Sequence, residues 1–251
     1  MATIVAGTAG GRPRCPEILA RHGPRVHGEG TIANYGRNMT QPWIDPTGHS
    51  VEEFVAALAA KGPRQLLGVA GPPGSGKTTA AHHLAHAFAH SAVVPVDGFH
   101  LSNAQLRRTE SLDRKGAPDT FDVPGLVTAL QRLRTARGDV YLPGFEHVID
   151  DPIAAEHVVA ADCTLVIVEG NYLLVDEGPW AAVRPLLDAV IYLDVPWSLA
   201  RPRLVARQMA KGKDRERAEA WVDRSDQANF DLITTTRDRA DLVVAAEPAR
   251  S

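Results

Sequence analysis

The sequence has only two cysteines, Cys15 and Cys163, which lie far apart and have no metal-binding spacing or disulfide framework around them. It also lacks an apolar stretch approaching the roughly 20 residues that a membrane-spanning helix needs. Its first residues lack the continuous apolar core of a secretory signal. We therefore expect a cytoplasmic protein that works in a reducing compartment and has no membrane partner.

An excess of positive charge is lacking as well. The formal net charge is -3 over 251 residues, so the chain has no general electrostatic attraction for nucleic acid. Any anion must be bound by a local site, and we expect a small-molecule partner and no nucleic acid. With 44% hydrophobic and 23% charged residues, the composition is that of a globular protein with a sizeable core.

The character of the sequence changes near residue 49. Residues 1–48 are rich in Gly, Arg, Pro and Thr and show no apolar periodicity, which predicts a poorly ordered N-terminal extension. From Ser50 the apolar residues recur at helical spacing, with Ser50 as the expected cap and Glu53 at the capping-box position. We therefore expect one folded domain over residues 49–251.

Short apolar runs alternate with helical stretches along this domain. The expected strands are 65–70, 92–96, 164–168, 190–193 and 241–245, and the expected helices include about 77–90, 125–136 and 179–189. Such alternation implies parallel strands with crossover helices on both faces. We therefore predict a three-layer α/β fold with a mainly parallel central sheet.

Residues 71–78 complete the G-x-x-x-x-G-K-T pattern of a phosphate-binding P-loop, between a predicted strand and a predicted helix. Its backbone N–H groups would surround the phosphates, and Gly74 and Gly76 permit positive φ. Lys77 would add a cation at the β- and γ-phosphates, and Thr78 a hydroxyl for magnesium. We expect ATP and Mg2+ as cofactors. The expected nucleotide-binding residues are Gly71, Pro72, Pro73, Gly74, Ser75, Gly76, Lys77, Thr78 and Thr79.

Two acidic residues follow predicted strands, where a parallel sheet places its ligand crevice. Asp97 follows the run 92–96, and Glu169 follows the run 165–168. One acid can orient and deprotonate an acceptor hydroxyl, while the other can hold magnesium. A helix cap before His100 is the alternative role for Asp97.

Several segments resemble, in order, the motifs of the phosphoribulokinase and uridine kinase family, which also includes the bacterial type I pantothenate kinases. They are the P-loop, 96–100 (VDGFH), 114–122 (RKGAPDTFD), 141–147 (YLPGFEH) and 168–172 (VEGNY). The resemblance spans roughly residues 65–245. It implies a P-loop kinase with a helical lid, which moves the γ-phosphate of ATP to a hydroxyl of a small molecule.

The resemblance also implies roles for single residues. Asp97 matches the family's catalytic base and Glu169 its magnesium-associated carboxylate, so the expected metal ligands are Thr78, Glu169 and Asp97. The expected catalytic residues are Asp97, Lys77, Glu169 and Arg203. The expected acceptor-binding residues are Phe99, His100, Arg114, Lys115, Asp122, Phe145, His147, Asn171 and Tyr172. Asn229 is a further candidate for the acceptor pocket.

A basic run after the predicted strand 190–193 resembles the lid helix, whose closure would exclude water during transfer. The run comprises Arg201, Arg203, Arg207, Lys211 and Lys213. Arg203 is the expected catalytic cation, although the same run also fits a solvated basic helix face. We expect Pro202 to bend or delay this helix, and the charged segment 214–224 to form an exposed helix without a part in function.

The acceptor stays open at this point. Phe145-Glu146 stands where nucleoside kinases usually have a Tyr-Asp pair, while His147 fits the pantothenate kinase pattern better. Nucleoside, pantothenate-like and sugar acceptors are all compatible, as is a homodimer. The alternative from another class is an ATP-binding regulatory P-loop protein without phosphotransfer. Against it stands the joint presence of Asp97, Asp122 and Glu169, since a sensor needs no acceptor pocket.

Overall fold

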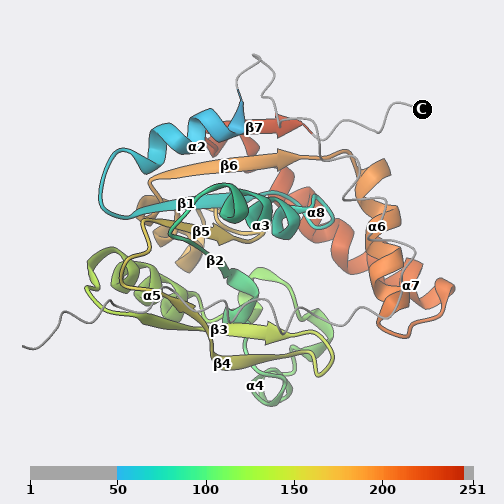
Figure 1. Cartoon of the computed structure of the whole chain (residues 1–251). Helices are drawn as coiled ribbons and strands as arrows, with labels where there is room; N and C mark the ends of the chain where they lie inside the picture. The colour runs from blue at the N-terminus through green and yellow to red at the C-terminus, as the bar shows by residue number, and fades with distance from the viewer. Residues whose placement is uncertain (1–49, 246–251) are drawn as a thin grey trace, which may run out of the picture. The chain divides into compact units, whose positions relative to one another are not determined.

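The structure is a computed structural model in which residues 50–245 are described (Figure 1). Within this range, a five-stranded parallel sheet has the strand order β2-β5-β1-β6-β7. The strands are β1 (Gln65–Ala70), β2 (Ser91–Pro95), β5 (Leu165–Glu169), β6 (Ala189–Asp194) and β7 (Leu242–Ala245). The predicted strands and the parallel sheet are thus confirmed to within a residue or two at each end. The expectation for residues 1–48 lies outside the described residues.

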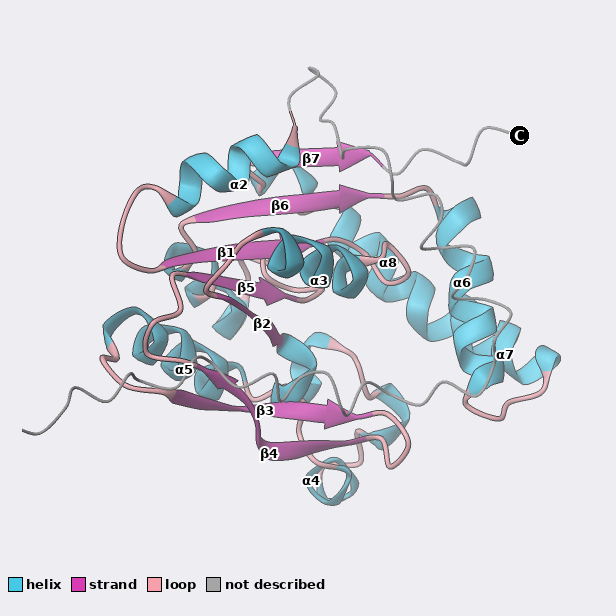
Figure 2. Cartoon of the chain, viewed as in Figure 1, coloured by secondary structure: helices cyan, strands magenta, loops and turns pink. Residues whose placement is uncertain are grey.

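Helices cover both faces of this sheet (Figure 2). On one face, α2 (Val51–Ala59) and α3 (Lys77–Ala87) bury side chains against Leu67 and Val69 of β1. On the other face, α5 (Val123–Thr135) and α8 (Gln227–Thr234) share a core with Leu66. Because successive strand residues point to opposite faces, β1 contributes to both cores, and the predicted three-layer α/β fold is confirmed.

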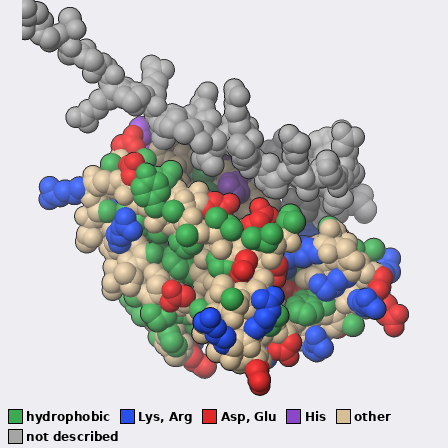
Figure 3. Space-filling model, turned by 90° about the horizontal axis from the view of Figure 1, so that it is seen from below, with side chains coloured by type: hydrophobic (Ala, Val, Ile, Leu, Met, Phe, Trp, Pro, Cys, Tyr) green, Lys and Arg blue, Asp and Glu red, His purple; other side chains and the backbone are tan. Residues whose placement is uncertain are grey.

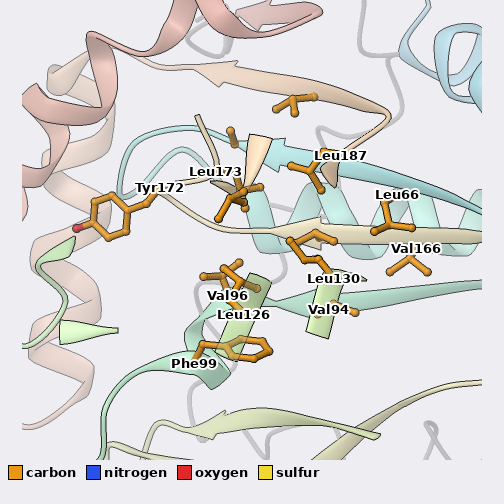
Figure 4. Close-up of a cluster of buried hydrophobic side chains, with 14 of the residues drawn as sticks. Leu66, Val94, Val96, Phe99, Leu126, Leu130, Val166, Tyr172, Leu173 and Leu187 are labelled. Carbon is orange, nitrogen blue, oxygen red and sulfur yellow. The ribbon is translucent and has the colours of Figure 1, made fainter. Parts of the chain in front are cut away.

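Aliphatic side chains from β2, β5 and α5 form one part of the second core. Figure 4 shows Leu126 beside Val96 and Leu130 beside Val94, all in the same buried cluster. Leu126 and Leu130 are completely buried, and burial of each such side chain stabilises the fold by about 1.5–3 kcal/mol. These buried contacts therefore hold in place the sheet edge that carries the functional residues.

Two local expectations are wrong, and a third is met only in part. Residues 179–189 form no α-helix but two short 3-10 turns, Gly178–Ala182 and Arg184–Leu186, because Pro185 removes a backbone donor in mid-segment. The Ser50 hydroxyl donates to the Glu52 carboxylate (2.7 Å) instead of capping the helix with Glu53. Pro202 does not delay its helix, since α6 runs from Trp197 to Ala210 through it, and a bend at Pro202 stays a prediction.

The helical lid follows β6. It consists of α6, α7 (Arg215–Trp221) and a π-helical turn, Val222–Asp226, that leads into α8. A separate antiparallel hairpin, β3 (Val140–Glu146) with β4 (Asp151–Val159), lies below the sheet in Figure 1, near the short α4 (Asn103–Arg108). None of the helices between residues 50 and 245 is long and apolar enough to cross a bilayer.

Arg64, just before β1, forms hydrogen bonds to three other segments of this domain. Its guanidinium donates to the carbonyls of Leu133 at the end of α5, of Ala160 and Ala161 after β4, and of Cys163 before β5, at 2.9–3.0 Å. Only a planar fork of five N–H donors can serve four acceptors in this way.

Replacing Arg64 by Lys is therefore expected to lower the free energy of unfolding by about 2 kcal/mol, because several carbonyls lose their donor. Urea denaturation would measure the change. Arg132→Lys, on the exposed face of α5, is the matched control and should stay within about 0.5 kcal/mol of the wild type. Equal stabilities of the two variants would contradict this role for Arg64.

Candidate active site

The P-loop connects β1 to α3 and takes backbone conformations that glycine favours. Gly74 and Gly76 have φ of 79° and 89°, in the left-handed region that other residues rarely adopt. A Cβ on Gly74 would also meet the backbone of Ala200 in α6, at 3.0 Å from its carbonyl oxygen. The loop therefore lies against the lid. Lys77 is buried, and its ammonium donates to the Pro72 carbonyl (3.0 Å).

Two carboxylates face the P-loop because of the strand order. β5 lies between β1 and β2, so Glu169 at its end is adjacent to the P-loop and also to Asp97, which follows β2 in the turn Val96–Phe99. The Thr78 hydroxyl donates to Glu169 (3.1 Å). The sequence placed all three residues at this edge, and the structure brings them together.

Burial governs the ionisation of this cluster. It raises the pKa of Glu169 to about 7, helped by the negative charge of Asp97. It lowers the pKa of Lys77 to about 8, against the attraction of Glu169 and Asp97. Two carboxylates and one ammonium thus lie close together, and a cation that binds there would favour the ionised form of Glu169.

These groups open into a cavity of about 530 Å³. Its wall comes from the P-loop, the turn after β2, the β3–β4 hairpin and the lid. The predicted residues that line it are Pro73, Gly74, Lys77, Thr78, Asp97, His100, Lys115, Phe145, His147, Glu169 and Asn171. Asn229 lines it too.

In the cavity wall beside the β3–β4 hairpin, a contact with the backbone holds the His100 ring in one tautomer. Its Nδ1 lies 2.8 Å from the Asp97 carbonyl oxygen, which can only accept, so Nδ1 carries the proton. Burial lowers the pKa of His100, which leaves the ring neutral and Nε2 free of a proton. The ring packs on Phe121 and Phe145, with centroids 3.9 and 5.0 Å apart.

Comparison with known proteins agrees with this geometry. The model of the phosphoribulokinase / uridine kinase family matches residues 66–251. The chain belongs to this family. It is similar to the "Uncharacterized protein YggC" of Escherichia coli K12, with 35% identity over 76% of this chain and 82% of that one. It is similar to the "Putative uridine kinase C227.14" of Schizosaccharomyces pombe, with 34% identity over 72% and 83%.

A solved structure from the same family is also similar. The "putative fructose transport system kinase" of Silicibacter sp. TM1040 has 36% identity and a TM-score of 0.72, and the match covers 78% of this chain and 99% of that one. The P-loop, the cavity and the lid described above therefore belong to an ATP-dependent kinase family. The names of these relatives do not agree on one acceptor.

Four residues that resemble family acceptor-binding positions do not line the cavity. Phe99 and Tyr172 pack in the core, and the Tyr172 hydroxyl donates to the Gly116 carbonyl. Asp122 caps α5 through the Gly125 N–H (2.9 Å), and Arg114 forms a surface pair with Asp119. Each expected side chain is engaged by a neighbour in its own segment or by the core, so contact with an acceptor would need a rearrangement.

The P-loop residues that do not line the cavity wall are Gly71, Pro72, Ser75, Gly76 and Thr79. They form the turn itself, whose backbone N–H groups are the expected phosphate ligands. Nucleotide binding by this loop stays a prediction for this chain.

The basic residues of the lid divide into two groups. Arg207, Lys211 and Lys213 line the cavity. Arg203 instead donates to the Gly74 carbonyl (3.1 Å), and Arg201 pairs with Asp223 (2.7 Å). Arg203 thus connects the lid to the P-loop, and its catalytic role stays a prediction. Figure 3 shows Lys and Arg side chains gathered at the edge formed by the lid, interspersed with acidic ones.

Sequence reasoning missed part of this wall. Trp221 and Asp226 line the cavity, although the charged segment before Asp226 was expected to be exposed and without function. Asp226 precedes Asn229 by three residues, and residues at this spacing share a helix face. That spacing was the available signal. Lys211 reaches Asp150 of the β3–β4 turn (3.5 Å), a contact between distant segments that no local pattern encodes.

Gly98 sets the distance between the hairpin and the turn that carries Asp97. A Cβ at this position would overlap the Pro143 carbonyl of β3. Gly98→Ala should therefore lower the free energy of unfolding by about 1–3 kcal/mol through overpacking, measured by urea denaturation. Gly138→Ala is the control, because a Cβ there meets nothing within 4 Å. A stable Gly98→Ala protein would show that the hairpin can move away freely.

Proposed function

We propose that the chain is a kinase that transfers the γ-phosphate of ATP to a hydroxyl group of a small molecule, with Mg2+ as cofactor. The observation that carries this proposal is the position of Asp97, which lines the same cavity as Lys77 and Glu169. A carboxylate there can meet an acceptor hydroxyl beside bound phosphates. Membership of the family supports the use of ATP.

The residues present suit MgATP. The P-loop offers backbone donors and Lys77 for the phosphates. Thr78, Glu169 and Asp97 offer hydroxyl and carboxylate oxygens, which Mg2+ prefers, and this ion usually keeps several waters and needs few protein ligands. When bound, Mg2+ would neutralise charge that develops on the β- and γ-phosphates. Such a cation would also favour the ionised form of the buried Glu169 carboxylate.

In the proposed reaction, Asp97 takes the proton of the acceptor hydroxyl as that oxygen bonds to the γ-phosphorus. The bond from the γ-phosphorus to the bridging oxygen breaks at the same time, and ADP leaves with that oxygen. Lys77 and Arg207 place positive charge around the moving phosphoryl group. Contact of the lid with the P-loop through Arg203 would keep water out and favour transfer over hydrolysis.

The proposal is tested by screening acceptors for ADP production. The panel comprises nucleosides, pantothenate, pentoses, hexoses and their phosphates, each with MgATP and with the wild-type protein. A kinase should release ADP faster with one class of compound than with buffer alone. If ATP binds and none of them stimulates ADP release, the regulatory P-loop protein is the better description.

Asp97→Asn should leave nucleotide binding near normal while reducing kcat about 10²- to 10⁴-fold, because an amide cannot take the hydroxyl proton. Steady-state kinetics with the best acceptor, together with a fluorescent-nucleotide titration, would measure both quantities. Asp113→Asn is the matched control, since Asp113 is exposed and does not line the cavity. Unchanged turnover in Asp97→Asn would remove Asp97 as the base.

A further inference from the structure

The buried carboxylate of Asp226 has an ionic partner for only one of its two oxygens. The residue is 7% exposed, and its Oδ1 lies 3.6 Å from Nη2 of Arg207. Its Oδ2 has no hydrogen-bond partner, alone among the buried side-chain polar atoms within residues 50–245. Leaving a buried acceptor unpaired costs about 1–3 kcal/mol, and more for a charged group. A purely structural acid would gain from pairing both oxygens.

The location of Asp226 indicates a role for the unpaired Oδ2 in binding a ligand. The residue ends the π-helical turn Val222–Asp226, which directs its side chain to the cavity wall. Such turns inside helical segments are frequent at functional sites. One helical turn later, Asn229 also lines the cavity and donates to the Gly116 carbonyl (3.4 Å).

Asp226 lies on the acceptor side of the cavity. The Tyr172 hydroxyl donates to the same Gly116 carbonyl that Asn229 contacts. Burial raises the pKa of Tyr172, and the negative charges of Asp97 and Asp226 add to this shift. The Asp226 carboxylate faces Arg207 of the lid. Asp226 thus lines the same cavity as Asp97, the proposed base, and as Arg207.

Three polar groups of this wall accept hydrogen bonds, beside the cations Lys115, Arg207, Lys211 and Lys213 that line the same cavity. Asp97 offers its carboxylate, His100 offers an unprotonated Nε2, and Asp226 offers Oδ2. A ligand that complements them must bring several donors, and hydroxyl groups do so without charge. The Phe145 ring, packed against His100, adds an apolar surface for the carbon skeleton between those hydroxyls.

We propose that Asp226 is a specificity-determining residue whose Oδ2 accepts a hydrogen bond from a second hydroxyl group of the acceptor, one that is not phosphorylated. The acceptor is then a polyhydroxylated compound and not a simple alcohol. This inference rests on the proposed kinase function, because it concerns the same cavity and the same acceptor.

The test compares an acceptor with its deoxy analogues. For the best compound in the panel, each hydroxyl other than the phosphorylated one is removed in turn, and kcat/KM is measured for the wild type, Asp226→Leu and Asp226→Asn. In the wild type, one analogue should lose about 10- to 100-fold, because Oδ2 is left without its donor. In Asp226→Leu this loss should disappear, and the KM of the parent acceptor should rise by a similar factor. Asp226→Asn keeps one acceptor oxygen and should lie between the two.

Two further readouts separate recognition from a structural role. The KM for ATP should stay near the wild-type value, and the melting temperature of Asp226→Leu should be equal to or above that of the wild type, because a buried unpaired oxygen is removed. Asp223→Asn, in the same π-helical turn but outside the cavity wall, is the control and should change neither acceptor kinetics nor analogue discrimination.

Three different results would contradict this proposal, and each has its own meaning. If Asp226→Leu and Asp226→Asn discriminate the analogues as the wild type does, or if both melt well below it, Asp226 does not read the acceptor while the kinase function stands. If the variants lower kcat at unchanged acceptor KM, Asp226 acts by orienting Arg207, and the inference is again overturned. If no compound stimulates ADP release by the wild type, the proposed function fails and this inference fails with it.

Discussion

The burial of the Lys77 ammonium beside two carboxylates is the constraint on which the rest of the site depends. The groups come from three separate segments, and only the strand order brings them together: β5 lies between β1 and β2, so Glu169, the P-loop and Asp97 reach the same edge of the sheet. Charges cannot be held there without partners. The carboxylates and the ammonium therefore offset part of one another's charge, and a bound cation would favour the ionised form of Glu169.

Much of this arrangement could be predicted from the sequence because it is encoded locally. The P-loop pattern fixes the turn after β1, and apolar runs mark the strands. Carboxyl ends of parallel strands meet at one edge, so Asp97 and Glu169 could be placed before the structure was known. Errors arose where local hydrogen bonding took another form. The Ser50 hydroxyl donates to Glu52 and accepts no N–H of the helix, and residues 178–186 form separate turns around Pro185, which has no N–H to donate.

The acceptor side of the site was harder to predict because tertiary contacts decide it. Arg203 and Arg207 are one helical turn apart in α6, yet only Arg207 lines the cavity, since Arg203 is directed to the Gly74 carbonyl. Asp122 and Arg114 resemble family acceptor-binding positions, but nearby partners hold both. Asp226 was missed because the charged segment just before it was expected to be exposed, although its spacing from Asn229 places both residues on one helix face.

The missing side chain of Gly98 couples two parts of the protein that lie some 45 residues apart in the chain. The backbone of the β3–β4 hairpin occupies the space that a Cβ would fill, so the hairpin that carries Phe145 and the turn that carries Asp97 pack backbone against backbone. Sliding the hairpin outward to enlarge the cavity would leave a void at this contact, which costs stability. New substrates are then most readily accommodated by exchanging side chains at the hairpin tip and along α8, while both backbones stay in place.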